Sequence, residues 1–157
     1  MASRWPPQKS VVSGTGESGL GWARRLQFVH AGLNNVGGFA LPVAKYLGNK
    51  YGYSPESGAA TSKRVWSLLG MLAARLKAQR AAGSRYYVGD ALTAADVYSA
   101  TFAAMFRPLP DAQCAMDTGI RTMLESCDAQ TEAALDPLLF EHRDMMYAKH
   151  LELPLSL

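Results

Sequence analysis

The 157-residue sequence has little cysteine and histidine, with two residues of the first kind and three of the second. Cys114 and Cys127 lack the short spacing of a metal or redox motif, so they indicate buried or free thiols and exclude a disulfide framework. His142 and His150 cannot share one metal ion, because eight residues of helix separate their backbones by about 12 Å. We therefore expect no metal site and a reducing compartment, the cytoplasm.

Long apolar runs and charge clusters are missing as well. No apolar stretch reaches the roughly 18 residues of a membrane-spanning helix, and the polar first ten residues lack the apolar core of a secretory signal. Charged residues make up only 18% of the chain, the formal net charge is +3, and the basic residues form no run of five or six. We therefore expect a globular domain that binds neither nucleic acid nor a membrane.

Alternation of strand length is also absent, whereas helical periodicity is widespread. Residues 1–17 are rich in Ser, Gly and Pro and are expected to form a flexible arm. Beyond them Trp22, Leu26 and Val29 recur at i, i+4 and i+7, which is the pattern of one helix face. Further helices are predicted near 41–47, 54–82, 94–106, 118–126 and 136–150. The sequence therefore predicts an all-α domain over residues 18–157.

The most specific motif is the run Gly89-Asp90-Ala91-Leu92-Thr93-Ala94-Ala95-Asp96. Thr93 and Asp96 have the three-residue spacing of a capping box, in which each side chain accepts the backbone N–H of the other residue. From Val97 to Phe106 no residue is charged, and apolar residues point in every direction. A helix that is apolar on all sides is typical of the centre of a bundle.

This motif and its surroundings resemble the all-helical C-terminal domain of the glutathione S-transferase superfamily. In that family the pattern G-D-x-L-T-x-A-D opens the buried central helix, and a long helix precedes it, as one is predicted to do here. The run from Phe140 to Tyr147, followed by Leu153-Pro154, is also similar to the end of bacterial and fungal members. The resemblance covers residues 19–157 and implies an orthogonal helical bundle of about five to six helices.

The thioredoxin-like domain of a full transferase has no counterpart in the sequence. A single βαβ unit takes about 30 residues, which is more than the arm of residues 1–17 provides. The resemblance therefore carries over no catalytic residue and no cofactor site. We expect glutathione to bind only if a thioredoxin-like partner domain is supplied.

Two other patterns receive no function. Gly14 to Gly19 fits G-x-G-x-x-G, but a dinucleotide site also needs a preceding strand and an acid about 20 residues later, and neither is present. Cys127 has Asp128 beside it, and a neighbouring negative charge does not favour a reactive thiol. A glycine linker and an ordinary thiol are the predictions.

In transferases the first helix of this domain lines the cleft that binds the electrophilic substrate. The resemblance therefore implies a set of candidate pocket residues: Trp22, Arg25, His30, Tyr98 and Phe102. Aromatic residues at helical spacing also indicate plain bundle packing, and the sequence leaves both interpretations open.

Two functions follow from the resemblance. The first is a non-catalytic module that binds a protein or a small hydrophobic ligand. Without a thioredoxin-like domain the apolar side of the first helix and the tyrosines from Tyr46 to Tyr53 would be exposed, so we expect a homo-oligomer or a partner protein that covers the first helix. The alternative is a fragment or subunit of a glutathione transferase, which supplies the hydrophobic side of the active site for the electrophile and is inactive alone.

Overall fold

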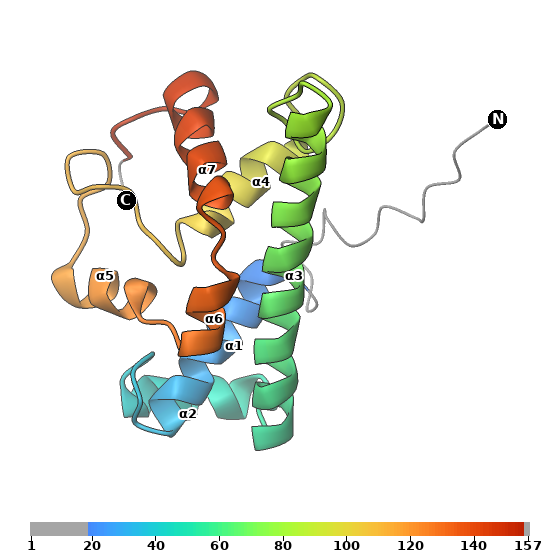
Figure 1. Ribbon diagram of the computed structural model, residues 1–157. Helices are drawn as coiled ribbons and strands as arrows, with labels where there is room; N and C mark the ends of the chain where they lie inside the picture. The colour runs from blue at the N-terminus through green and yellow to red at the C-terminus, as the bar shows by residue number, and fades with distance from the viewer. Residues whose placement is uncertain (1–18, 156–157) are drawn as a thin grey trace.

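The computed structural model describes residues 19–155, and over this range the chain forms seven α-helices and no strand (Figure 1). The helices are α1 (Leu20–Leu33), α2 (Leu41–Lys50), α3 (Pro55–Ala81), α4 (Ala94–Ala103), α5 (Thr118–Glu125), α6 (Ala129–Ala134) and α7 (Pro137–His150). The all-α prediction is confirmed, although the described helices number seven and not five to six. The predicted arm and the start of its glycine motif lie outside the described residues.

Short polar side chains begin most of the helices. Ser54 precedes α3 and accepts the backbone N–H of Ser57 at 3.2 Å. Asp117, Asp128 and Asp136 accept backbone N–H groups of the first turns of α5, α6 and α7 in the same way. Each cap satisfies an N–H that has no partner within its helix, which fixes where the helix begins.

The longest helix, α3, packs against α1, α6 and α7 (Figure 1). Val65, Leu69, Leu72 and Leu76 follow one another at steps of four and three, and all of them are buried. Together with residues of α1 and α7 they form the larger of two apolar clusters. This core fixes the relative positions of the helices that line the pockets described below.

The apolar side of α1 is covered in part within the chain, and its residues Trp22 and Leu26 stay half-buried. Phe28 and Val29 are buried, and α1 packs against both α2 and α3. Gly32 permits this approach, because a Cβ at that position would overlap the carbonyl oxygen of Phe39 and lie 2.8 Å from the Cβ of Ala44. The exposed large apolar residues of this region lie on or beside α2 instead: Val36, Leu41, Val43, Tyr46 and Tyr51.

The helix that opens with the capping box is less enclosed than the sequence predicts. Ala95, Asp96, Ala100 and Ala103 are buried, and α4 packs mainly against α7. Tyr98 is 41% exposed on another face of the same helix. A ten-residue, alanine-rich helix buries one side here, so the prediction of a helix surrounded by the bundle is wrong for that face.

None of the helices in the described part of the chain is both long and apolar enough to cross a membrane.

Candidate functional site

The five candidate pocket residues do not line one cavity. Trp22 packs edge-on against the ring of Tyr51, with centroids 4.8 Å apart, and Arg25 is exposed. Phe102 packs against the main apolar cluster, whereas Tyr98 is exposed on α4. Of the five, His30 lines a described cleft.

That cleft has a volume of about 650 Å³ and lies between α1, α3 and the segment that leads from α5 into α6. We call it the α1–α3–α6 cleft. Its apolar lining comes from Phe28, Ala31, Val36, Ala59 and Trp66, and its polar lining includes Arg24, Gln27, His30, Ser62, Lys63, Cys127 and Asp128.

Arg24 is the most buried charged group of this cleft, with 2% of its surface exposed. One of its terminal nitrogens, Nη2, donates to the carbonyl oxygens of Leu124 and Ser126, both at 2.9 Å. The guanidinium also lies over the rings of Phe28 and Phe106, at 4.2 and 4.6 Å from their centroids. Burial lowers the pKa of Arg24, but carbonyl oxygens and aromatic faces compensate the buried cation, which ties α1 to the end of α5.

A chain of side-chain hydrogen bonds continues this polar wall. Gln27 accepts from Arg24 at 3.2 Å and donates to the hydroxyl of Thr131 at 3.1 Å. The indole N–H of Trp66 donates to the same hydroxyl at 2.9 Å, which in turn donates to Asp128 at 3.0 Å. The hydroxyl donor of Thr131 and both lone pairs of its oxygen are therefore all used. These hydrogen bonds fix the positions of α1, α3 and α6 relative to one another.

The environment of Cys127 differs from the one that its sequence neighbour predicts. Nη2 of Arg24 donates to the Sγ atom of Cys127 at 3.3 Å. The carboxylate of Asp128 is used elsewhere, because it accepts the backbone N–H of Thr131 at 2.7 Å and the hydroxyl of that residue. This sulfur thus accepts a hydrogen bond from an arginine that lies 103 residues away in the chain, which no local pattern reveals.

His30 lies on the same cleft, with one ring nitrogen already engaged. Its Nδ1 atom is hydrogen-bonded to the hydroxyl of Tyr53. Gly58 leaves room for this pair, because a Cβ there would lie within 3 Å of both side chains. The sequence identified His30 as a cleft residue, but it gave no sign of this partner.

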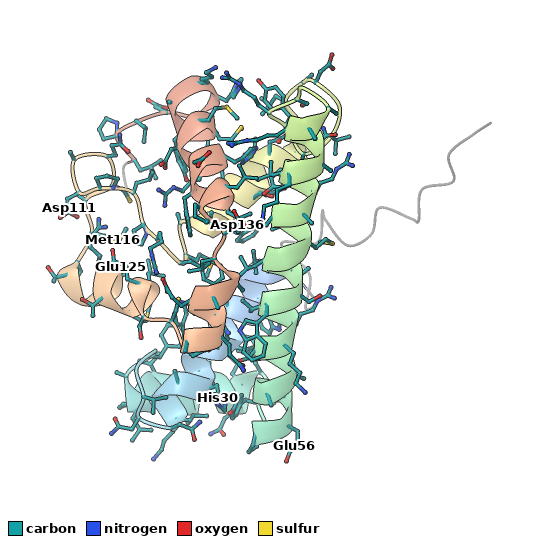
Figure 2. The ribbon with its side chains drawn as sticks, in the orientation of Figure 1. His30, Glu56, Asp111, Met116, Glu125 and Asp136 are labelled. Atoms are coloured by element: carbon teal, nitrogen blue, oxygen red, sulfur yellow. The ribbon has the colours of Figure 1, made fainter. Side chains whose placement is uncertain are left out.

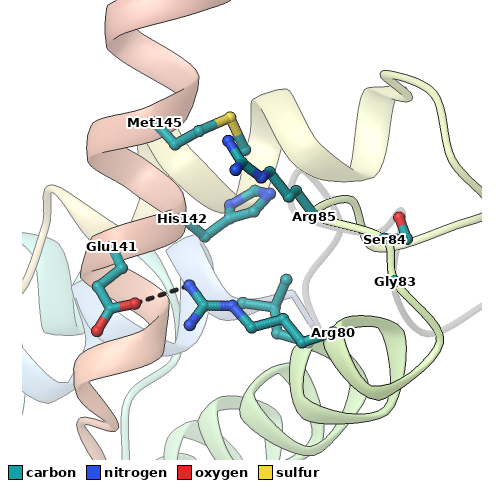
Figure 3. A pocket seen from close by; sticks show the side chains of 8 residues that line it. Arg80, Gly83, Ser84, Arg85, Glu141, His142 and Met145 are labelled. Carbon is teal, nitrogen blue, oxygen red and sulfur yellow. Dashed lines mark hydrogen bonds and ion pairs between the residues drawn. The ribbon is translucent and has the colours of Figure 1, made fainter.

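A second cavity of about 530 Å³ lies between α3, the loop after it and α7 (Figure 3), and we call it the α3–α7 pocket. It is lined by Leu76, Arg80, Gly83, Ser84, Arg85, Glu141, His142 and Met145. The sequence predicted no site here, because the residues come from two helices about 60 positions apart.

His142, which lines the α3–α7 pocket, belongs to a buried carboxylate–imidazole pair. Nε2 of His142 lies 3.0 Å from Oδ1 of Asp96, and both side chains are almost fully buried. Asp96 also accepts the backbone N–H of Tyr87 at 2.7 Å, and its other oxygen accepts the N–H of Thr93 at 2.9 Å and the Thr93 hydroxyl at 2.7 Å. The predicted capping box is therefore formed, and its carboxylate also orients a histidine.

The second ring nitrogen of His142, Nδ1, is a buried polar atom without a hydrogen-bond partner among the described residues. Burial lowers the pKa of His142, and Arg80 lowers it further, while the hydrogen bond and charge of Asp96 act in the opposite direction. The neutral ring that results donates from Nε2 to Asp96 and presents a lone pair at Nδ1.

The described residues contain no group of three or more His, Cys, Asp or Glu side chains that could hold a metal ion. In the comparisons with known proteins, no family model, no curated protein and no solved structure matches the chain.

Proposed function

We propose that this domain is a non-catalytic binding module of the glutathione S-transferase C-terminal type, whose α1–α3–α6 cleft takes a small hydrophobic molecule with an acidic group. The observation that carries the proposal is the lining of the cleft. The rings of Phe28 and Trp66 and the side chain of Val36 line the same cavity as the ammonium group of Lys63. No ion pair or hydrogen bond engages Lys63 within the described part of the chain.

The size of the cleft and the state of its polar groups support binding more than chemistry. Small-molecule sites measure about 300–1,000 Å³ and are mostly apolar with a few polar groups. Arg24, Gln27 and Thr131 are held in hydrogen bonds to one another or to the backbone. They form a rigid polar wall, and Lys63 at the edge is the cation that an acidic ligand would meet.

The test uses 1-anilinonaphthalene-8-sulfonate, a fluorescent probe with apolar rings and one negative charge. Ala59→Leu narrows the cleft from α3, whereas Ala60→Leu places the same side chain one residue away, outside the lining. We expect saturable binding by the natural chain, a loss of at least about tenfold in affinity with Ala59→Leu, and no change with Ala60→Leu. Lys63→Gln is expected to weaken the sulfonate but not a neutral naphthalene analogue.

Binding that is equal in the Ala59→Leu and Ala60→Leu variants would contradict the proposal, because it would place the probe elsewhere. Circular dichroism and thermal unfolding of each variant provide the control for folding. Ala59 and Ala60 are both exposed positions of one helix, so the two substitutions carry a similar structural risk.

The alternative is a fragment or subunit of a glutathione transferase. The capping box that Thr93 and Asp96 form at the start of α4 favours it, because the resemblance to the transferases rests on that motif. On this proposal the isolated chain neither binds glutathione in a calorimeter nor conjugates it, and addition of a thioredoxin-like domain restores turnover. Conjugation by the isolated chain would contradict both proposals, since each assigns it no catalytic residue.

A further inference from the structure

The α3–α7 pocket contains an unfilled hydrogen-bonding position. Buried polar atoms almost always have a partner in the protein or in ordered water, yet Nδ1 of His142 has none among the described residues. The ring cannot turn away, because Asp96 holds Nε2 at 3.0 Å and the ring of Tyr87 packs edge-on against it at 4.7 Å. A fixed imidazole whose Nδ1 is buried and without a hydrogen-bond partner in the described part of the chain therefore belongs to a residue that lines a cavity of about 530 Å³.

Two arginines line the same pocket. Figure 3 shows the guanidinium groups of Arg80 and Arg85 on either side of the His142 ring. Arg80 comes from the last turn of α3 and pairs with Glu141 at 2.7 Å. Arg85 comes from the following loop and forms no ion pair or hydrogen bond with any residue in the described range. One carboxylate against two guanidinium groups leaves an excess positive charge at the pocket.

The groups that face His142 define what the pocket can recognise. Asp96 on α4 fixes Nε2–H as its donor, so the neutral ring offers a lone pair at Nδ1 and accepts a proton donor from a ligand. Arg80 and Arg85 offer donors in the fork geometry that matches the oxygens of a phosphate. Leu76 and Met145 supply apolar contact. The three features match a ligand with an oxyanion, a hydroxyl group and a short carbon skeleton.

We propose that the α3–α7 pocket binds a phosphorylated polyol, with the phosphate on Arg85 and Arg80 and a hydroxyl group donating to Nδ1 of His142. The cavity is several times larger than a free phosphate ion, which favours an ester over inorganic phosphate. This site is separate from the α1–α3–α6 cleft, and its ligand class goes beyond the function proposed above.

The experiment is isothermal titration calorimetry at pH 7.5 with three probes: glycerol 3-phosphate, propyl phosphate and inorganic phosphate. Propyl phosphate has the charge and length of the first probe but lacks its hydroxyl groups. We expect glycerol 3-phosphate to bind at least about tenfold more tightly than the other two. Equal affinities for the two esters would overturn the role of Nδ1, and tighter binding of inorganic phosphate would overturn the polyol.

Arg85→Gln tests the oxyanion part, with Arg25→Gln as the matched control, because both arginines are exposed and neither has an ion pair in the described part. The first variant should lose at least about tenfold in affinity for glycerol 3-phosphate, and the second none. An equal affinity in both variants, or no binding by the natural chain at millimolar ligand, would overturn the proposal.

A His142 variant would alter the buried pair with Asp96 as well as the proposed ligand contact, so a loss of binding would not separate the two effects, and the histidine is tested in the natural chain. The ¹⁵N resonance of Nδ1 reports whether that atom accepts a hydrogen bond. We expect it to shift on addition of glycerol 3-phosphate and to stay unchanged with propyl phosphate. An unchanged resonance at saturating glycerol 3-phosphate would overturn the contact.

Discussion

At the scale of single residues, Asp96 links three segments through one carboxylate. It accepts the N–H of Tyr87 from the loop after α3, the N–H and hydroxyl of Thr93 at the start of α4, and Nε2 of His142 on α7. Removal of a buried partner leaves unsatisfied donors, and each costs about 1–3 kcal/mol. The carboxylate that caps α4 therefore also fixes the histidine that lines the α3–α7 pocket.

The lowered pKa of His142 predicts a stability that depends on pH. The unfolded histidine titrates near 6.5 and the folded one at a lower pH, because burial disfavours the charged ring. The unfolded chain then binds more protons between the two values, so the free energy of unfolding falls as the pH drops below about 6.5. One titrating group can change the free energy of unfolding by at most about 1.4 kcal/mol per pH unit.

Urea unfolding at pH 7.5 and at 5.5 measures this fall. Glu56 and Asp136 also have lowered pKa values, each because of hydrogen bonds to its carboxylate, but they titrate at lower pH and do not contribute here. His142→Gln should remove most of the fall, whereas His150→Gln, at an exposed position, should retain it. A natural chain equally stable at both pH values would contradict the prediction.

At the scale of elements, local signals were predictable and distant contacts were not. Thr93 and Asp96 are three residues apart, so the sequence displays their capping box directly. The six-residue α6 is too short to show a helical period, and it was missed. Helix α2 runs to Lys50, past the predicted end at residue 47, because Gly48 packs against Val29 and Leu33 of α1, with a Cβ position 3.6 Å from each.

The features that the sequence did not predict are contacts between helices that lie far apart in the chain. The donation from Arg24 to Cys127 and the pairing of His142 with Asp96 span 103 and 46 positions. Neither follows from periodicity or caps, because those signals act within one turn of helix. Of the predicted pocket, only His30 lies on a described cleft, since the helices turn Trp22 and Phe102 into separate packing contacts.

Two glycines on helices provide a matched test of helix packing. Gly32 lies where α1 crosses α2, and a Cβ there would overlap the Phe39 carbonyl oxygen. Gly70 lies within α3 with no atom within 4 Å of its Cβ position. Gly70→Ala should raise the free energy of unfolding by about 0.5–1 kcal/mol, whereas Gly32→Ala should lower it by about 1–3 kcal/mol.

Chemical denaturation of the natural chain and both variants measures these differences. The two changes add the same methyl group to a helix, so their difference isolates the approach of α1 to α2. Two alanine variants of equal stability would show that this approach is not as close as the structure has it.

At the scale of the whole molecule, charge and apolar exposure are unevenly distributed. No Asp or Glu occurs between Glu17 and Glu56, and α2 carries Lys45 and Lys50. The segment around α5 carries Asp111, Asp117 and Glu125, two of which are labelled in Figure 2, but Arg121 on α5 pairs with Asp111 at 2.6 Å and lies 3.8 Å from Glu125. In Figure 1, α5 lies on the side of the molecule away from α3, and α2 lies at the base of the molecule.

The segment before α2 adjoins the end of α5, and both helices carry exposed apolar side chains. A Cβ on Gly37, just before α2, would lie 3.0 Å from Oγ of Ser126 at the end of α5. Tyr46 on α2 is 62% exposed and Ile120 on α5 is 51% exposed, and α5 buries none of its residues. An apolar surface with the lysines of α2 therefore lies beside an apolar surface on α5, where Arg121 pairs with the nearby carboxylates.

We expect a second copy of the chain to cover this face. In a two-fold dimer each α2 meets the α5 of the other copy, so the exposed apolar side chains of both helices are buried twice. Light scattering after size exclusion should show a dimer at high concentration. Tyr46→Glu should give monomers, whereas Tyr98→Glu, at an exposed tyrosine on α4, should leave the dimer intact. A natural chain that stays monomeric at several hundred micromolar would rule out the pairing, because the face would then be exposed without a second copy to cover it.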